Sequence, residues 1–169
     1  VAAVMETARV LVSGPRPLRD TIFLLTDAEE VGMIGAQSFF DMHSLASKVG
    51  AAVNVEARGS NGLAIMFQTS PGNSELIDLW ADHAIRPSGN SLANAVYGKL
   101  PNDTDLTVPL KKGIIGINAA FIDRFADYHM PTDNVANLDP RSLQHLGDFA
   151  VTTTRALANA PQLPSQIGE

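Results

Sequence analysis

The sequence predicts an α/β domain in which helices flank both faces of a mostly parallel, mixed sheet. Apolar segments of strand length alternate with segments whose apolar residues recur at helical spacing, which is the pattern of layered α/β domains. The chain has 169 residues, of which 45% are hydrophobic and 18% charged, so it can build a single packed core. We therefore expect a three-layer sandwich over residues 1–160, followed by a tail over residues 161–169.

Residues 1–56 contain the patterns of two helices and two strands. Residues 1–12 carry apolar side chains at helical spacing, and the Pro-rich stretch that follows ends this helix. Residues 21–26, Thr-Ile-Phe-Leu-Leu-Thr, form an apolar run that is typical of a strand buried on both faces. A helix is expected to end near Met42, and residues 51–56 are the next expected strand.

Residues 63–158 continue the alternation. Asn73 or Ser74 is a suitable N-cap for one helix, and Asp139 with Pro140 begins the last one. The segment 86–103 is rich in Pro, Gly, Ser and Asn and is expected to be a long surface segment. The other expected elements are a strand at 63–69, helices at 74–84, 104–112 and 140–158, a strand at 114–120 and an irregular segment at 123–137.

The composition argues against several classes of protein. Lys and Arg number 12 and Asp and Glu 18, giving a formal charge of −6, whereas a nucleic-acid binder would present a basic face. The chain has no cysteine, so disulfide scaffolds, thiolate metal sites and cysteine nucleophiles are excluded. No run of about 18 apolar residues is present, so no membrane span is expected within these residues. The residues predict no particular oligomeric state.

The candidate chemical residues follow the expected strands. Glu29 and Glu30 come directly after residues 21–26, Glu56 ends the next strand, and His129 lies in a polar loop. In open α/β sheets, ligands bind outside the carboxyl ends of the strands. Carboxylates and imidazole without thiolate suit Zn, Mn or Co in a catalytic site, where a neighbouring Glu can take a proton from water.

Each of these residues also has a structural interpretation. The paired acids, Glu29 and Glu30, are equally well explained as acidic residues at a helix N-terminus, which the helix dipole favours. Glu56 by itself is an ordinary strand-end carboxylate, and a lone histidine in a loop is more often structural than catalytic. The remaining histidines are on helical patterns and are expected at the surface or in packing: His43, His83 and His145. Spacing alone therefore leaves a metal site and a structural interpretation open.

Four motifs make the pattern specific. Residues 23–36 contain Glu-Glu-Val-Gly-Met-Ile-Gly-Ala, which resembles the Glu-Glu-x-Gly-x-x-Gly-[Ser/Ala] signature of the M28 family of zinc metallopeptidases. Asn-Val-Glu at 54–56 resembles that family's Asn-Leu-Asp segment, Thr-Asp at 104–105 its Ser-Asp pair, and residues 128–134 its His-Thr-x-x-Asp-Thr stretch. The Glu-Ala-Arg-Gly variant and residues 67–73 are most similar to the endoplasmic-reticulum and vacuolar-membrane subgroup and its bacterial relatives.

The resemblance implies a role for each candidate residue. In the family the first Glu of the pair is the general base, which corresponds to Glu29, and the second is a zinc ligand, which corresponds to Glu30. The late histidine, His129, would bind the same metal, and Glu56 would bind the other. Tyr128 is the candidate donor to the tetrahedral oxyanion. Two zinc ions are expected in the intact catalytic domain.

The sequence departs from the family pattern in two ways. Glu56 replaces the common Asp, so its backbone must sit one methylene farther from a metal. Two further ligands of the family lie upstream of a helix that resembles residues 1–8, so the chain looks like the C-terminal part of a catalytic domain that is incomplete at its N-terminus. We therefore expect this fragment by itself to be inactive, and zinc to be absent from it.

The resemblance implies a zinc-dependent aminopeptidase that removes N-terminal residues from peptides, with a peptide substrate and no nucleic-acid partner. Two alternatives stay open: a glutaminyl-cyclase-like zinc acyltransferase and a non-catalytic, peptidase-like interaction domain. The subgroup also implies that the parent protein is anchored to a membrane and acts outside the cytosol. Nothing in the residues predicts which substrate side chain is preferred.

Overall fold

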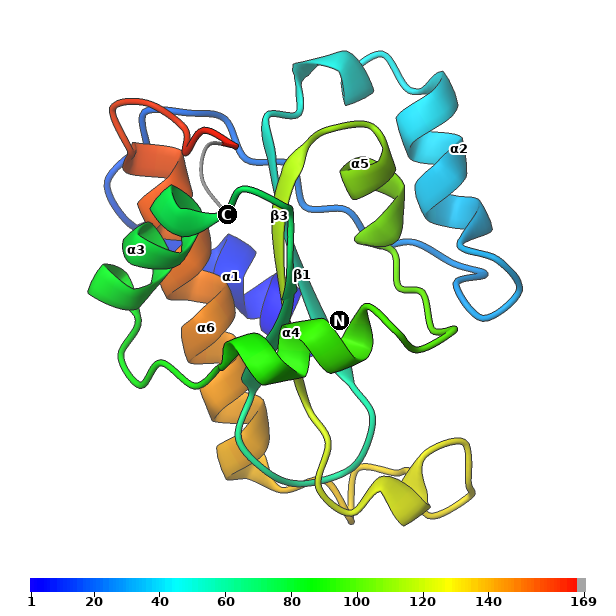
Figure 1. The fold of residues 1–169 in the computed structure, drawn as a ribbon. Helices are drawn as coiled ribbons and strands as arrows, with labels where there is room; N and C mark the ends of the chain where they lie inside the picture. Colours follow the sequence, from blue (N-terminus) through cyan, green and yellow to red (C-terminus); the bar gives the residue numbers. More distant parts are fainter. Residues whose placement is uncertain (167–169) are drawn as a thin grey trace.

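A computed structural model describes residues 1–166 as a three-stranded sheet between two layers of helices (Figure 1). The strand order is β1-β3-β2, with β1 at Ala51–Ala57, β2 at Ile65–Thr69 and β3 at Ile115–Phe121. β1 runs parallel to β3, and β2 runs antiparallel to it. The mixed α/β sandwich that the sequence predicts is therefore confirmed, with one pairing of each kind.

The helices cover both faces of the sheet (Figure 1). On one side the long helix α6, Pro140–Asn159, contacts β1 and β3 and packs against α1, Ala2–Ser13, and α3, Ser74–His83. On the other side α5, Thr107–Lys111, contacts β3 and α2, Ile34–Met42. The remaining helical segments are α4 at Ser91–Tyr97, which contacts β2, and short 3₁₀ turns at Ala46–Lys48 and Phe125–Asp127.

The core is built around β3, all of whose residues are buried. Ile117 and Ala119 are fully buried, and they belong to a cluster that includes Leu146, Phe149 and Leu157 from α6. Apolar residues at helical spacing along α6 thus meet the centre of the sheet, as amphipathic periodicity predicts. Within residues 1–166, no helix combines the length and the apolar character that a membrane crossing needs.

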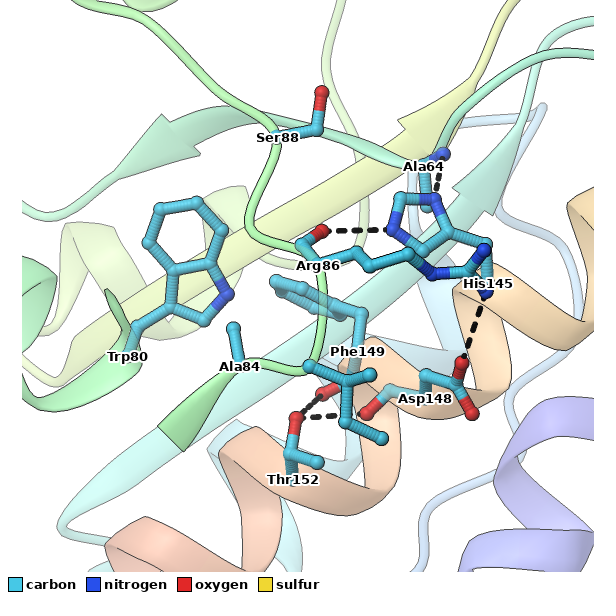
Figure 2. Close-up of a pocket in the computed structure, with 10 residues that line it drawn as sticks. Ala64, Trp80, Ala84, Arg86, Ser88, His145, Asp148, Phe149 and Thr152 are labelled. Atoms are coloured by element: carbon cyan, nitrogen blue, oxygen red, sulfur yellow. Dashed lines mark hydrogen bonds and ion pairs between the residues drawn. The ribbon is translucent and has the colours of Figure 1, made fainter. Parts of the chain in front are cut away.

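His145 is a packing residue of this core, as its helical pattern indicates. It lies on α6 and is 5% exposed. Its Nδ1 accepts the backbone N–H of Ala64 at 3.0 Å, and its Nε2 donates to the carbonyl of Arg86 at 2.8 Å (Figure 2). The adjoining cavity beside Trp80 and Phe149 measures about 10 Å³, so it has room for one water molecule at most. This part of the molecule therefore holds α3, α6 and the sheet together.

The strand expected at 21–26 is the clearest wrong prediction. The segment belongs to no strand, and among the described residues its backbone makes no hydrogen bond. It faces β1 across a groove of about 960 Å³ that both segments line. Leu25 is 55% exposed and Ile22 39%. The segment lacks an adjacent strand edge, and backbone pairing with such an edge is what defines a strand.

Smaller differences concern element boundaries. The surface segment 86–103 contains α4, which begins where the side chain of Asn90 accepts the N–H of Ala93 at 2.8 Å. The helix expected at 104–112 begins only at Thr107, and the strand expected at 63–69 begins at Ile65. Residues 161–166 have no regular structure, and the rest of the predicted tail, 167–169, lies outside the described residues.

Candidate functional site

Glu29 and Glu30 lie in a tight loop that leads into α2. The N–H groups of Gly32 and Met33 both donate to the carbonyl of Glu29, at 3.0 and 2.8 Å. Ala28 has φ 60°, a left-handed conformation that costs a non-glycine residue energy. At Gly35 a Cβ atom would lie 2.5 Å from the carbonyl oxygen of Asp27, so only glycine allows the loop to close. The Gly spacing of the motif therefore shapes the turn that presents the two acids.

His129 lies in a second loop, between β3 and α6. The Ser60 hydroxyl donates to the Asp127 carboxylate and lowers the pKa of Asp127, which anchors this loop to the end of β1. At Gly59 a Cβ atom would lie 2.2 Å from the carbonyl oxygen of Asp123, so glycine is required for the two chain segments to approach so closely. His129 itself has φ 58°. Left-handed residues therefore occur in both loops that carry the candidate site.

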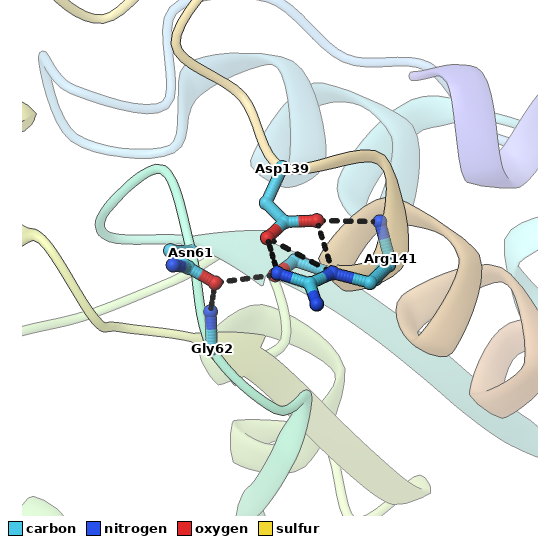
Figure 3. Close-up of polar contacts among 5 residues, drawn as sticks. Asn61, Gly62, Asp139 and Arg141 are labelled. Atoms are coloured by element: carbon cyan, nitrogen blue, oxygen red, sulfur yellow. Dashed lines mark hydrogen bonds and ion pairs between the residues drawn. The ribbon is translucent and has the colours of Figure 1, made fainter.

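The start of α6 fixes the other end of the loop that carries His129 (Figure 3). The Asp139 side chain caps the helix by accepting the N–H of Arg141 at 2.8 Å, and its own N–H donates to the carbonyl of Ser60 at 2.8 Å. The Arg141 guanidinium, 2.7 Å from the carboxylate, lowers the pKa of Asp139 to about 2. The backbone N–H groups of Ser60 and Asn61 both donate to the carbonyl of Asp123. Both ends of the loop are thus bonded to the segment after β1.

The two loops meet at Glu30 and His129. His129 Nε2 lies 2.8 Å from Glu30 Oε1, although 99 residues separate them in sequence. Both side chains are accessible, with 57% of His129 and 63% of Glu30 exposed. Tyr128 stacks on the imidazole with ring centroids 3.8 Å apart and an interplanar angle of 21°. The structure therefore brings together three of the five predicted site residues, and Glu29 directly precedes one of them.

Glu56 is held separately, at the end of β1. Its Oε1 accepts a hydrogen bond from Asn54 Nδ2 at 2.8 Å, and the same amide lies 3.3 Å from Asn118 Oδ1. Asn118 is fully buried in β3, directly opposite Asn54, and also donates to Thr104 and Gln68. This chain of amides fixes the orientation of Glu56. No hydrogen bond or ion pair joins Glu56 to Glu30 or His129 in the described part of the chain.

The electrostatics of the site are those of crowded carboxylates. Burial, followed by the charges of Glu30 and Asp105, raises the pKa of Glu29. Burial also raises the pKa of Glu56, which the hydrogen bond from Asn54 opposes and the charges of Glu29 and Asp105 reinforce. Both carboxylates are thus less acidic than usual, mainly because burial disfavours their charged forms and further because nearby charges of the same sign repel them.

Similarity to known proteins identifies the family of this chain. The model of peptidase family M28 matches residues 1–154. This chain belongs to peptidase family M28. The M28 chain is 33% identical to endoplasmic reticulum metallopeptidase 1 of Rattus norvegicus, which matches 97% of this chain and 19% of the relative. It is 32% identical to a vacuolar membrane protease of Schizosaccharomyces pombe, over 94% of this chain and 19% of that protein. The resemblance that the motifs carry is therefore confirmed.

A solved structure supports the fold. The crystal structure of an aminopeptidase from Legionella pneumophila superposes with a TM-score of 0.67 at 20% identity, covering 95% of this chain and 44% of that one. This likeness shows that the M28 chain shares the fold of that enzyme. The chain spans about a fifth of the length of the two curated relatives described above.

The carboxylates and the imidazole of this M28 chain are donors of the kind that zinc binds. Residues 1–166 contain no ready cluster of three or more His, Asp or Glu ligands, so Glu30 and His129 form a pair with Glu56 apart from it. Asp105 Oδ1 is buried and has no hydrogen-bond partner among the described residues, while Thr26 donates to Oδ2. A cation would stabilise a buried carboxylate oxygen that has no hydrogen-bond partner and lies near other negatively charged carboxylates.

Sequence reasoning assigned no role to two residues that the structure places in this network. Asp105 is electrostatically linked to both Glu29 and Glu56. Its only sequence signal is the Thr-Asp pair before α5, which resembles a family motif. Asn118 has no such signal, because an Asn within an apolar strand gives no indication of the partners it will meet across the sheet.

Proposed function

We propose that this chain is part of the catalytic domain of a zinc-dependent aminopeptidase. The observation that carries the proposal is the pairing of Glu30 and His129 directly beside Glu29, whose pKa is raised. Glu30 and His129 would hold one zinc ion, and Glu56 would contribute to a second. When bound, zinc supplies a Lewis acid that makes a water molecule acidic at neutral pH.

The residues of the chain would carry out the proton transfers. Glu29 accepts a proton from the attacking water as the oxygen–carbon bond to the scissile carbonyl forms. When the carbon–nitrogen bond breaks, Glu29 returns that proton to the leaving amine. A raised pKa serves both steps, because the carboxylate must hold the proton near neutral pH and then release it. The Tyr128 hydroxyl would donate a hydrogen bond to the carbonyl oxygen as negative charge develops on it.

The substrates would be peptides with a free N-terminus, and the compartment one outside the cytosol. Support for this comes from the family and from two named relatives, a reticulum metallopeptidase and a vacuolar membrane protease. The anchoring of the parent protein to a membrane is part of the same proposal.

The test compares the full-length protein with its Glu29→Gln variant. Zinc content is measured by elemental analysis, and release of N-terminal amino acids is measured on a panel of peptides. We expect the variant to keep its zinc and to lose activity by about 10²- to 10⁴-fold, the range for loss of a general base. An active variant would exclude Glu29 as the base. Ammonia release from a peptide with N-terminal Gln, without amino-acid release, would show a cyclase instead.

A matched control is Glu75→Gln, which changes an exposed glutamate on α3, away from both loops. It should leave zinc content and activity unchanged. The isolated 169-residue chain should bind zinc more weakly than the full-length protein, because its described part offers only Glu30 and His129 as a close pair. Two tightly held zinc ions in the isolated chain would show that the ligand assignment is wrong.

A further inference from the structure

We infer that Arg58 is a positioning residue that holds the Tyr128–His129 stack in place. Its guanidinium carbon lies 5.3 Å from the centre of the Tyr128 ring, within the range of a cation–π contact. Tyr128 in turn stacks on His129, and His129 Nε2 meets Glu30. A continuous series of contacts therefore joins the end of β1 to the proposed metal-binding pair. The role rests on the proposed function, because it matters only if His129 is a ligand.

His129 needs such support because little else fixes it. Its side chain is 57% exposed, so packing leaves the imidazole largely free. Its backbone has φ 58°, a strained conformation for a non-glycine residue that persists only where surrounding contacts hold it. Among the described residues, the imidazole contacts the Tyr128 ring and the Glu30 carboxylate. The stack and the contact with Glu30 are therefore the restraints on the imidazole when no metal is bound.

Arg58 can provide this restraint because its backbone is anchored to the sheet. Its N–H donates to the carbonyl of Phe121 at 3.0 Å, which extends the β1–β3 pairing by one step beyond Ala57. The guanidinium forms no ion pair with a carboxylate in the described part of the chain. An exposed arginine that carries no salt bridge and lies against an aromatic ring is placed to act through that ring. Lysine could keep the cation but would lose the planar contact.

The test uses NMR of the histidine ring protons in the zinc-free, 169-residue chain at one fixed pH. The His129 signals are assigned by their loss in His129→Asn. Because the ring of His129 stacks on Tyr128, its ring protons should have chemical shifts that differ from those of the exposed His83. In Arg58→Met they should move toward the His83 positions, and in Arg58→Lys they should move by less. The zinc affinity of the full-length protein, measured by competition with a chromophoric chelator, should weaken about two- to five-fold in Arg58→Met, the factor that an exposed cation–π contact supports.

The matched control is Arg155→Met, which removes an exposed arginine from α6 and should change neither readout. Tyr128→Leu removes the ring itself and should reproduce the NMR change of Arg58→Met. Unchanged His129 signals in a folded Arg58→Met chain would overturn the inference, and so would an equal change in Arg155→Met. If Arg58→Met does not fold, unchanged signals in Arg58→Lys together with changed ones in Tyr128→Leu would also overturn it. Ring signals that respond as expected, together with a full-length protein that binds no zinc, would contradict the proposed function alone.

Discussion

Two segments of this chain have similar apolar sequences and opposite surroundings. β3, Ile-Gly-Ile-Asn-Ala-Ala-Phe, pairs along both edges and is buried at every position. Residues 21–26, Thr-Ile-Phe-Leu-Leu-Thr, pair with nothing among the described residues, and Leu25 stays 55% exposed. The difference teaches that an apolar, β-branched sequence makes a segment suitable for a strand, whereas a neighbouring edge makes it one.

The groove between the two regions shows what the unpaired segment lacks. The groove, of about 960 Å³, lies between residues 21–26 and one edge of β1. The opposite edge of β1 pairs with β3. Backbone groups on both sides of the groove are therefore left to water. Such edges are the parts of a sheet that can accept another strand. The two regions should consequently differ in local stability, in tolerance of substitution and in amide protection.

The largest expected contrast is in hydrogen exchange. Amides of β3 should open only when the whole chain unfolds, which costs about 5–15 kcal/mol in a typical domain. Amides of residues 21–26 should exchange with a local opening free energy near zero, because no backbone partner protects them. Hydrogen–deuterium exchange with mass spectrometry measures both segments in one sample. Protection of residues 21–26 comparable to that of β3 would mean that the segment has found a strand partner in solution.

A pair of identical substitutions sharpens the comparison. Ile117→Ala removes a fully buried side chain of β3 and should lower the free energy of unfolding by about 2–5 kcal/mol. Ile22→Ala makes the same change at a position that is 39% exposed, and should cost less than about 1 kcal/mol. Urea denaturation of both variants gives the two values. Equal losses would show that residues 21–26 contribute to the core as a true strand does.

The same contrast explains which parts of the fold the sequence predicts. Residues 51–56, 114–120 and 140–158 have periodic patterns, and each forms the expected element because its apolar residues find the common core. The segment 21–26 has an equally clear pattern, but pairing depends on neighbours that a local pattern does not contain. The helix α4 was hidden in a polar segment, since its start is set by the cap at Asn90 rather than by apolar spacing.

A polar position inside β3 provides the next prediction. Asn118→Ala removes the side chain that bonds to Asn54, Thr104 and Gln68, and leaves these polar groups without their partner. The expected loss is about 1–3 kcal/mol, the cost of buried groups left unsatisfied. Asn159→Ala, at the exposed end of α6, is the control and should change stability by less than about 0.5 kcal/mol. Urea denaturation measures the free energy of unfolding of both variants. A loss no larger than that of the control would mean that water replaces the side-chain amide of Asn118.

The candidate site shows a similar division between what is and is not visible in sequence. Glu29, Glu30, Glu56, Tyr128 and His129 could be named because they belong to contiguous motifs. The structure brings Glu30, Tyr128 and His129 together, and their roles stay predictions. Arg58 contacts Tyr128, and Asn118 acts on Glu56 through Asn54. These contacts cross between strands and loops, and only the three-dimensional arrangement reveals them.

The smallest expected effect is the pH dependence that the raised pKa of Glu56 produces. Because burial raises this pKa in the folded state, folding favours the protonated form. Its contribution to stability is therefore fully present below the ordinary pKa of glutamate, and is lost as the pH rises through the folded value. Glu56→Gln should stabilise the zinc-free chain at pH 7, by less than the loss in Asn118→Ala since Glu56 keeps some solvent access. Urea denaturation between pH 4 and pH 8, with a chelator present, measures this.

Glu75 is the matched control because its shift has the opposite sign. The backbone N–H of Ser165 donates to its carboxylate at 2.8 Å and lowers the pKa of Glu75. Its contribution is present above the ordinary pKa of glutamate and is lost as the pH falls through the folded value. Glu75→Gln should thus slightly destabilise the chain at pH 7, where Glu56→Gln stabilises it. Destabilisation by both variants would mean that the bond from Asn54 outweighs burial at Glu56, so that the carboxylate is held as a charged group even without metal.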